Sequence, residues 1–281
     1  MIPTPRKPIV DGRPVRDTAL ARLRGRIQGL LVSSGERQEA DLERLLRSGP
    51  GVTRANTVAV ASPKGGVGKT TIAFLVGSML ASHRLLSVVA VDANPEFGTL
   101  ADLASDHRGE RSLADLLFEL DDVATAAQLR RYVSQLPSGL HLLAAPHAAV
   151  TPGEYGRLLA FLSIFYEVVI LDLGTGLTAP VASLALERAD QLVLVTTPDL
   201  MASQLSLSAL DHLERERTTL LVNKAPSGMP TPRTLHRSVV LPHDEQLQLM
   251  LDTGTYSLGA LPRNVRVPVK RLALAVSEQL V

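Results

Sequence analysis

The chain has 281 residues, of which 45% are hydrophobic, a formal net charge of +1 and no cysteine. The hydrophobic fraction is enough for a sizeable core, and the near-neutral charge gives no global attraction to nucleic acid or anionic membrane. The lack of cysteine excludes disulfides, iron–sulfur clusters and thiolate metal sites. No apolar run reaches the ~18 residues of a transmembrane helix, and the first residues lack the apolar stretch of a secretory signal. We therefore expect a cytoplasmic protein, with peripheral association with a membrane or nucleoid left open.

The first 53 residues are predicted to form an N-terminal extension. Four prolines up to residue 14 predict an extended or disordered tip. Apolar spacing then predicts a helix over Val15–Leu31 and a shorter helix over Glu39–Arg47. The first helix carries several arginines, which could bind DNA, anionic lipid or a protein partner. The favoured alternative is a solvated face whose apolar stripe packs on the core or on a second copy of the chain.

From residue 54 to residue 281, predicted strands alternate with predicted helices in one domain. The strands are expected at Thr57–Ser62, Leu86–Val91, Leu140–Ala145, Glu167–Leu173, Gln191–Thr196 and Thr219–Asn223. Helices are expected between them, among others at Thr70–Ala81, Pro152–Ser163 and Met201–Arg215. This alternation predicts an α/β fold with a doubly wound, mainly parallel sheet that has helices on both faces.

The most informative segment is Lys64–Thr71, between the first predicted strand of the domain and a helix. It follows the phosphate-loop pattern G-x-x-x-x-G-K-[ST], except that Pro63 takes the place of the first glycine and Lys64 lies five residues before Lys69. Glycines let backbone N–H groups approach a ligand, and the N-terminus of the following helix favours anions. An ordinary glycine-rich turn is the less favoured alternative, because strand, loop and helix come in the required order. The predicted phosphate-binding residues are Gly65, Gly66, Val67, Gly68, Lys69, Thr70 and Thr71.

Polar side chains in and near this loop predict a catalytic magnesium site. Lys69 is expected to bridge the β- and γ-phosphates, and the Thr70 hydroxyl is expected to bind Mg²⁺. Asp92 and Asp172 end two predicted strands, where ligands bind in such sheets. Asp172 is predicted to hold Mg²⁺, and Gly174 to present its N–H to the γ-phosphate. Asp92 is predicted to hold the metal through water or to order the attacking water; a strand-capping role is the alternative.

A fourth segment bears on the choice of base. Asn223 ends a predicted strand and is followed by Lys-Ala-Pro226, where a related GTPase would carry an Asp three residues after the Asn. Proline has no side-chain acceptor for guanine, so adenine is favoured, with the Asn223 amide pairing to its edge. Pro242, within Leu241–Asp244, is expected to pack on the ring; an ordinary helix start at this segment is an equal alternative.

Together these motifs resemble the MinD/ParA family of deviant phosphate-loop ATPases, over roughly residue 57 to the C-terminus. The resemblance implies ATP and Mg²⁺ as cofactors and a homodimer that sandwiches ATP, in which Lys64 touches the phosphates of the other subunit. It also implies slow hydrolysis that a protein partner stimulates. The stretch Val91–Pro95, together with Gly98–Leu100, is most similar to actinobacterial members near secretion, conjugation or pilus systems.

One position departs from the family pattern and bears on the expected activity. In the segment Val88–Pro95, the family usually has Asp just before the proline, whereas this chain has Asn94 before Pro95. An amide can position the attacking water but cannot take its proton, so we predict weak or partner-dependent ATPase activity. We expect an ATP-dependent switch that positions, partitions or assembles a cargo such as DNA, a secretion system or a pilus. An ATP-dependent ligase or synthetase on the same fold is the alternative, and it would require a small substrate for turnover.

The C-terminal segment Val269–Leu280 is predicted to be an amphipathic helix. MinD relatives end in a membrane-targeting helix, which makes membrane binding one interpretation. This segment is rich in alanine, has no aromatic residue and carries only Lys270 and Arg271 nearby. Packing against the sheet is therefore the favoured prediction.

Overall fold

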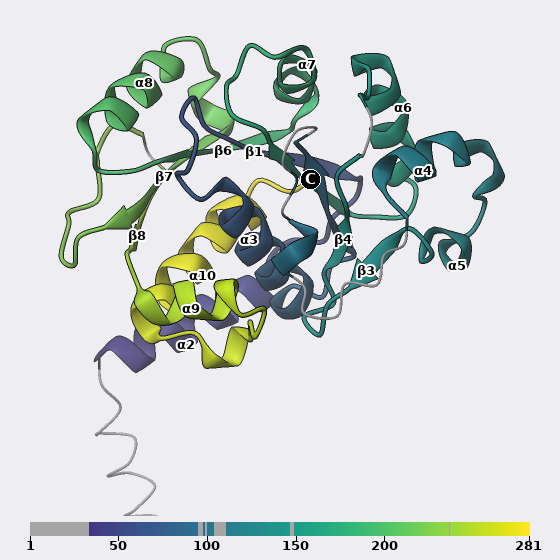
Figure 1. The fold of residues 1–281 in the computed structure, drawn as a ribbon. Helices are drawn as coiled ribbons and strands as arrows, with labels where there is room; N and C mark the ends of the chain where they lie inside the picture. The colour runs from purple at the N-terminus through teal and green to yellow at the C-terminus, as the bar shows by residue number, and fades with distance from the viewer. Residues whose placement is uncertain (1–33, 95–97, 99, 104–110, 147–148, 236) are drawn as a thin grey trace, which may run out of the picture. The chain divides into compact units, whose positions relative to one another are not determined.

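A computed structural model describes residues 34–94, 98, 100–103, 111–146, 149–235 and 237–281 of the chain (Figure 1). The chain divides into two units, residues 1–41 and residues 42–281, and the second unit contains the sheet. The predicted proline-rich tip and the helix Val15–Leu31 lie outside the described residues. The predicted helix Glu39–Arg47 is confirmed as the greater part of α2, Ser34–Arg47. The domain boundary placed between residues 53 and 54 stays a prediction.

Within the described part of the chain, eight strands form one sheet in the order β3-β4-β2-β5-β1-β6-β7-β8. All neighbouring strands are parallel except β3 and β4, so the predicted mainly parallel sheet is confirmed. The strands are β1 (Asn56–Ala61), β2 (Val88–Ala93), β3 (Val133–Gln135), β4 (His141–Leu143), β5 (Val168–Leu173), β6 (Gln191–Thr196), β7 (Thr218–Ala225) and β8 (Ser238–Pro242).

Helices cover both faces of the sheet, because successive side chains of the central strands point to opposite sides. Val58 and Val60 of β1 belong to one apolar cluster with α3 and α10, whereas Ala59 and Ala61 belong to another with α4–α7. Figure 1 shows the same two layers, with α3, α9 and α10 on one side. The helices are α3 (Lys69–His83), α4 (Leu113–Phe118), α5 (Ala126–Leu129), α6 (Pro152–Leu162), α7 (Pro180–Arg188), α8 (Leu200–Leu210), α9 (Glu245–Asp252) and α10 (Arg263–Ser277).

The C-terminal helix α10 packs into the core, as the favoured prediction required. Val269, Leu272 and Val276 are at most 1% exposed and share a cluster with apolar residues of α3. The apolar stripe of this helix is therefore covered by the protein itself. None of the helices that the structure describes has the length and apolar character needed to cross a membrane.

Several elements differ from the sequence prediction at their ends. The helix predicted over Met201–Arg215 ends at Leu210, because the chain turns back through residues 211–217 to enter β7. The three-residue strand β3 was not predicted, and it pairs antiparallel with β4 at an edge of the sheet. A segment this short carries no periodic pattern, so its pairing with β4 decides its conformation.

Candidate functional site

The predicted phosphate loop connects the end of β1 to the start of α3, at the centre of the sheet. Gly66 has φ +73° and Gly68 has φ +95°, which is left-handed backbone that favours glycine. Gly68 is the N-cap of α3 and supplies no side-chain cap. Because glycine has no side chain, no N-cap side chain accepts from the first N–H groups of α3, and these groups and the helix dipole favour an anion.

Lys69, Thr70 and Asp172 come together beside this helix start. Lys69 is only 8% exposed, and burial lowers the pKa of its ammonium group. The negative charge of Asp172 acts in the other direction but does not outweigh burial. The Thr70 hydroxyl hydrogen-bonds Asp172, yet burial, with Asp92 nearby, raises the pKa of the Asp172 carboxyl to about 7. The buried Oδ1 of Asp172 has no hydrogen-bond partner. A Mg²⁺ ion held by Thr70 and Asp172 would satisfy this oxygen and neutralise phosphate charge, so these residues fit the predicted metal.

Asp92 lies next to Asp172, because the two are register partners on the parallel strands β2 and β5. Its carboxylate accepts hydrogen bonds from the backbone N–H groups of Asn94 (3.1 Å) and Leu100 (3.0 Å). Burial also raises the pKa of Asp92. These contacts support the alternative interpretation, a strand-capping Asp. Its role toward metal or water stays a prediction.

Asn94 and Gly174 line a pocket of about 290 Å³ between the ends of β2 and β5 and the start of α7. A Cβ atom on Gly174 would lie 3.4 Å from Asn94 Oδ1, so the two residues are close neighbours. The structure thus brings together the residue predicted to position water and the backbone predicted to face the γ-phosphate. Both roles stay predictions.

Lys64 makes a contact that the sequence did not indicate. Its Nζ atom lies 2.7 Å from Oδ1 of Asp199, the N-cap residue of α8. Asp199 also accepts hydrogen bonds from the Thr197 hydroxyl and from the backbone N–H of Ala202 (3.0 Å). Lys64 and these donors hold the pKa of Asp199 well below its usual range. Asp199 is far from Lys64 in sequence and has the pattern of an ordinary N-cap, so only the fold reveals the pair.

A side chain at the end of β7 contacts the backbone of the phosphate loop. Asn223 is 7% exposed, and its Nδ2 donates a 2.8 Å hydrogen bond to the carbonyl oxygen of Val67. The sequence interpretation assigned this amide to adenine, and that contact stays a prediction beside the observed one.

Pro242 is the last residue of β8, just before a helix. The Asp244 carboxylate accepts from the backbone N–H of Leu247 (2.9 Å) as the N-cap of α9, so the helix-start interpretation of this segment is confirmed. Packing of Pro242 on a base stays a prediction. A pocket of about 210 Å³ lies at this proline, with Pro226 and Arg271 among its lining residues.

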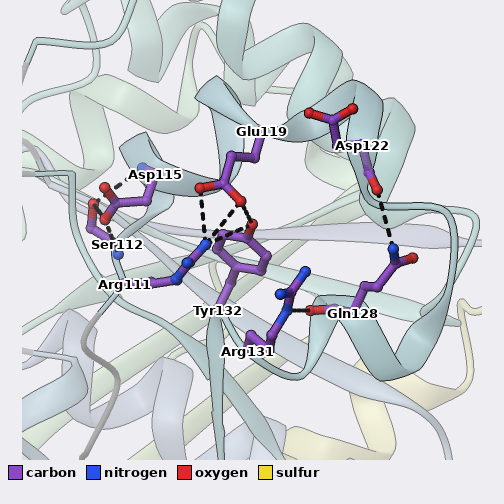
Figure 2. A network of polar contacts seen from close by, with 8 residues as sticks. All are labelled: Arg111, Ser112, Asp115, Glu119, Asp122, Gln128, Arg131 and Tyr132. Carbon is purple, nitrogen blue, oxygen red and sulfur yellow. Dashed lines mark hydrogen bonds and ion pairs between the residues drawn. The ribbon is translucent and has the colours of Figure 1, made fainter.

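A second polar cluster, around α4 and α5, has a structural role (Figure 2). Arg111 Nη1 lies 2.9 Å from both carboxylate oxygens of Glu119 and 3.0 Å from the hydroxyl of Tyr132. Tyr132 is 1% exposed and donates its own hydrogen bond to Glu119. The three side chains thus satisfy one another. Among the described residues, no group of three or more His, Asp or Glu side chains is placed to hold a metal ion.

A phosphate loop between a central parallel strand and a buried helix, with carboxylates at the ends of two neighbouring strands, defines a P-loop nucleotide-binding protein. A family model described as an AAA domain matches residues 55–219, more than half of the chain. The chain belongs to this family, and its fold is that of the MinD/ParA P-loop ATPases.

Two solved structures illustrate the likeness. A ParA family ATPase from Chlorobium tepidum TLS has a TM-score of 0.65 and 25% sequence identity, with 78% of this chain and 98% of that chain covered. The septum site-determining protein MinD from Pyrococcus horikoshii OT3, complexed with Mg-ADP, has a TM-score of 0.63 and 17% identity, covering 78% and 94%. The second match is a likeness of fold alone.

One relative is named for its association with secretion. The ESX-1 secretion-associated protein EspI of Mycobacterium tuberculosis strain H37Rv is 28% identical over 272 residues. The alignment covers 88% of this chain but 40% of the relative, so the chain spans less than half the length of that protein.

Proposed function

We propose that this protein is an ATP-dependent dimerisation switch with slow, Mg²⁺-dependent and partner-stimulated ATPase activity. The observation that carries the proposal is the convergence of Lys69, Thr70 and Asp172 at the uncapped start of α3. The ammonium group of Lys69 and the backbone N–H groups at the start of α3 can bind phosphate oxygens. The Thr70 hydroxyl and the unpartnered Asp172 oxygen can bind Mg²⁺, so the site has the groups that a magnesium–triphosphate complex requires.

The dimer is proposed from Lys64 and from family membership. Lys64 sits at the edge of the phosphate loop and is bound to a carboxylate of its own chain, Asp199. In the proposed ATP state, Lys64 exchanges this carboxylate for the phosphates of a second subunit. The names of the relatives support a role in positioning or assembly, and the EspI relative supports a secretion apparatus as the cargo.

The test is the mass of the protein in solution with Mg-ATP, with Mg-ADP and without nucleotide, together with nucleotide affinity. Of these three conditions, we expect a dimer only with Mg-ATP. Lys64→Ala should keep ATP affinity but remain monomeric, and Lys69→Ala should lose ATP affinity. Arg188→Ala, at the exposed C-terminal end of α7, is the control for loss of one positive charge. If the wild type binds ATP tightly yet stays monomeric at every protein concentration, the proposed dimer is wrong.

Asn94 gives a separate test of the slow hydrolysis. Asn94→Asp restores a carboxylate beside Gly174 and should raise turnover under saturating Mg-ATP, because a carboxylate can take the proton of the attacking water. Steady-state phosphate release measures this. Unchanged turnover would mean that the side chain at residue 94 does not limit the reaction, and fast unstimulated hydrolysis by the wild type would contradict the proposed slow switch.

A further inference from the structure

Two consecutive side chains at the end of β7 hold two consecutive carbonyl groups of the phosphate loop. Asn223 Nδ2 donates to the Val67 carbonyl oxygen at 2.8 Å, and Lys224 Nζ donates to the Gly66 carbonyl oxygen at 3.0 Å. These residues lie more than 150 positions apart in the chain, so the contacts are set by the parallel sheet and not by local sequence.

The backbone at Lys224 is unusual in a way that serves this contact. Lys224 has φ +55°, and the pairing of β7 with β8 shifts register between Val222 and Ala225. A left-handed lysine is unfavourable by itself and persists where its surroundings impose it. The irregularity interrupts the alternation of side chains along β7, and both Asn223 and Lys224 reach the same loop.

The geometry of the peptide group gives the two hydrogen bonds a consequence for ligand binding. In a planar trans peptide, the C=O and the N–H point in opposite directions. If the Gly66 carbonyl points to Lys224, the N–H of Val67 points away from Lys224. The Val67 carbonyl, held by Asn223, likewise turns the N–H of Gly68 away from Asn223. Both amide donors are thereby directed to the side of the loop opposite β7, where the loop can enclose an anion.

We propose that Lys224 is a positioning residue for phosphate binding, acting through the Gly66 carbonyl and together with Asn223. Its ammonium group fixes the orientation of the loop peptides, so that backbone N–H groups already face a di- or triphosphate before the ligand arrives. Lys224 then affects phosphate affinity without contacting the phosphates. The effect should extend to any polyphosphate ligand, whether or not it carries a base. This inference rests on the proposed nucleotide-binding function.

The test compares binding of Mg-ATP and of inorganic pyrophosphate by calorimetry, because pyrophosphate reports on the loop without a base. Lys224→Met keeps the length of the side chain and the same unfavourable backbone but removes the donor. We expect it to weaken both ligands by a similar factor, roughly tenfold, as for loss of one hydrogen bond from a charged group. Lys224→Arg should recover most of the loss, since a guanidinium can also donate to the carbonyl. The melting temperature of the ligand-free protein should fall by no more than about 2–4 °C, because one hydrogen bond of an exposed side chain is lost.

The controls separate this inference from the proposed function. Arg188→Met, an exposed arginine on α7, should leave both affinities as in the wild type. If the wild type binds neither ligand, the nucleotide-binding proposal and this inference both fail. If the wild type binds and Lys224→Met binds equally well, only the inference fails. Loss of ATP affinity with pyrophosphate affinity retained would place Lys224 at the base and overturn a role in orienting the loop.

Discussion

The buried carboxyl of Asp172 should make the stability of the ligand-free protein depend on pH. Asp172 is 2% exposed, and burial raises its pKa from the ordinary 3.8 to about 7. As pH rises from about 4, the unfolded chain loses this proton first, so stability falls until the folded protein also ionises near pH 7. A raised carboxyl pKa thus costs stability, and the cost is complete above pH 7.

The magnitude follows from the two pKa values. Between the two pKa values, each pH unit lowers the free energy of unfolding by ~1.4 kcal/mol. By pH 5 this loss has built up over about one pH unit, and by pH 8 over about three. Between pH 5 and pH 8, the free energy of unfolding of the wild type should therefore fall by about 3 kcal/mol relative to Asp172→Asn. Asparagine cannot ionise and still accepts from Thr70, so any constant effect of the amide cancels in this comparison.

The assay is denaturant unfolding of both proteins from pH 5 to pH 8 with EDTA and without nucleotide. Asp122→Asn, which removes an exposed carboxylate, controls for the change in net charge. Parallel stability curves for the wild type and Asp172→Asn across this range would refute the reasoning. So would a difference that grows toward low pH, because that sign belongs to a carboxylate stabilised by its surroundings.

Other predictions concern the capping residue beside the loop and two glycines. Asp199→Asn should retain the helix cap, since Asn caps as well as Asp, but it should release Lys64. With Mg-ATP, dimers of this variant should then form at a lower protein concentration than dimers of the wild type, as measured by sedimentation. Gly68→Ala places a Cβ in the space of Asn223 Nδ2 at φ +95°, so it should cost about 1–3 kcal/mol in denaturant unfolding and abolish ATP binding in calorimetry. Gly156→Ala has open space inside α6 and should instead gain about 0.5–1 kcal/mol with ATP affinity unchanged.

The sequence predicted the core of the fold because that core has strong periodic signals. The strand Gln191–Thr196 was placed with the bounds that the structure gives, and the phosphate loop fixed the junction between β1 and α3. The predictions were weaker where packing decides the structure. The short β3 pairs only because β4 is already in place, and α8 stops before its apolar pattern does.

The residues of the candidate site were named from the sequence, and their roles toward a ligand stay predictions; the contacts among these residues were not predicted. Sequence motifs name the groups that face a ligand, since those groups are set by the chemistry of the ligand. They say nothing about which residues hold the motif in place. Asp199 and Lys224 contact the loop from other elements at distances of 135 and 158 residues along the chain. Asp199 has the pattern of an ordinary cap, and Lys224 belongs to a segment that the sequence assigned to the base, so only the assembled sheet reveals their contacts with the loop.

In the proposed switch, these contacts bear on both the binding and the release of a polyanion. Before a nucleotide binds, each loop lysine already faces a carboxylate of its own chain: Lys64 pairs with Asp199, and Lys69 lies in the field of Asp172. Phosphates compete with those carboxylates for the same lysines. A magnesium ion would relieve the resulting repulsion at Asp172, whereas Asp199 has no such compensation and must give up Lys64 for the proposed dimer to form. Losing the γ-phosphate should therefore favour the return of Lys64 to Asp199, which gives the proposed switch a preferred direction after hydrolysis.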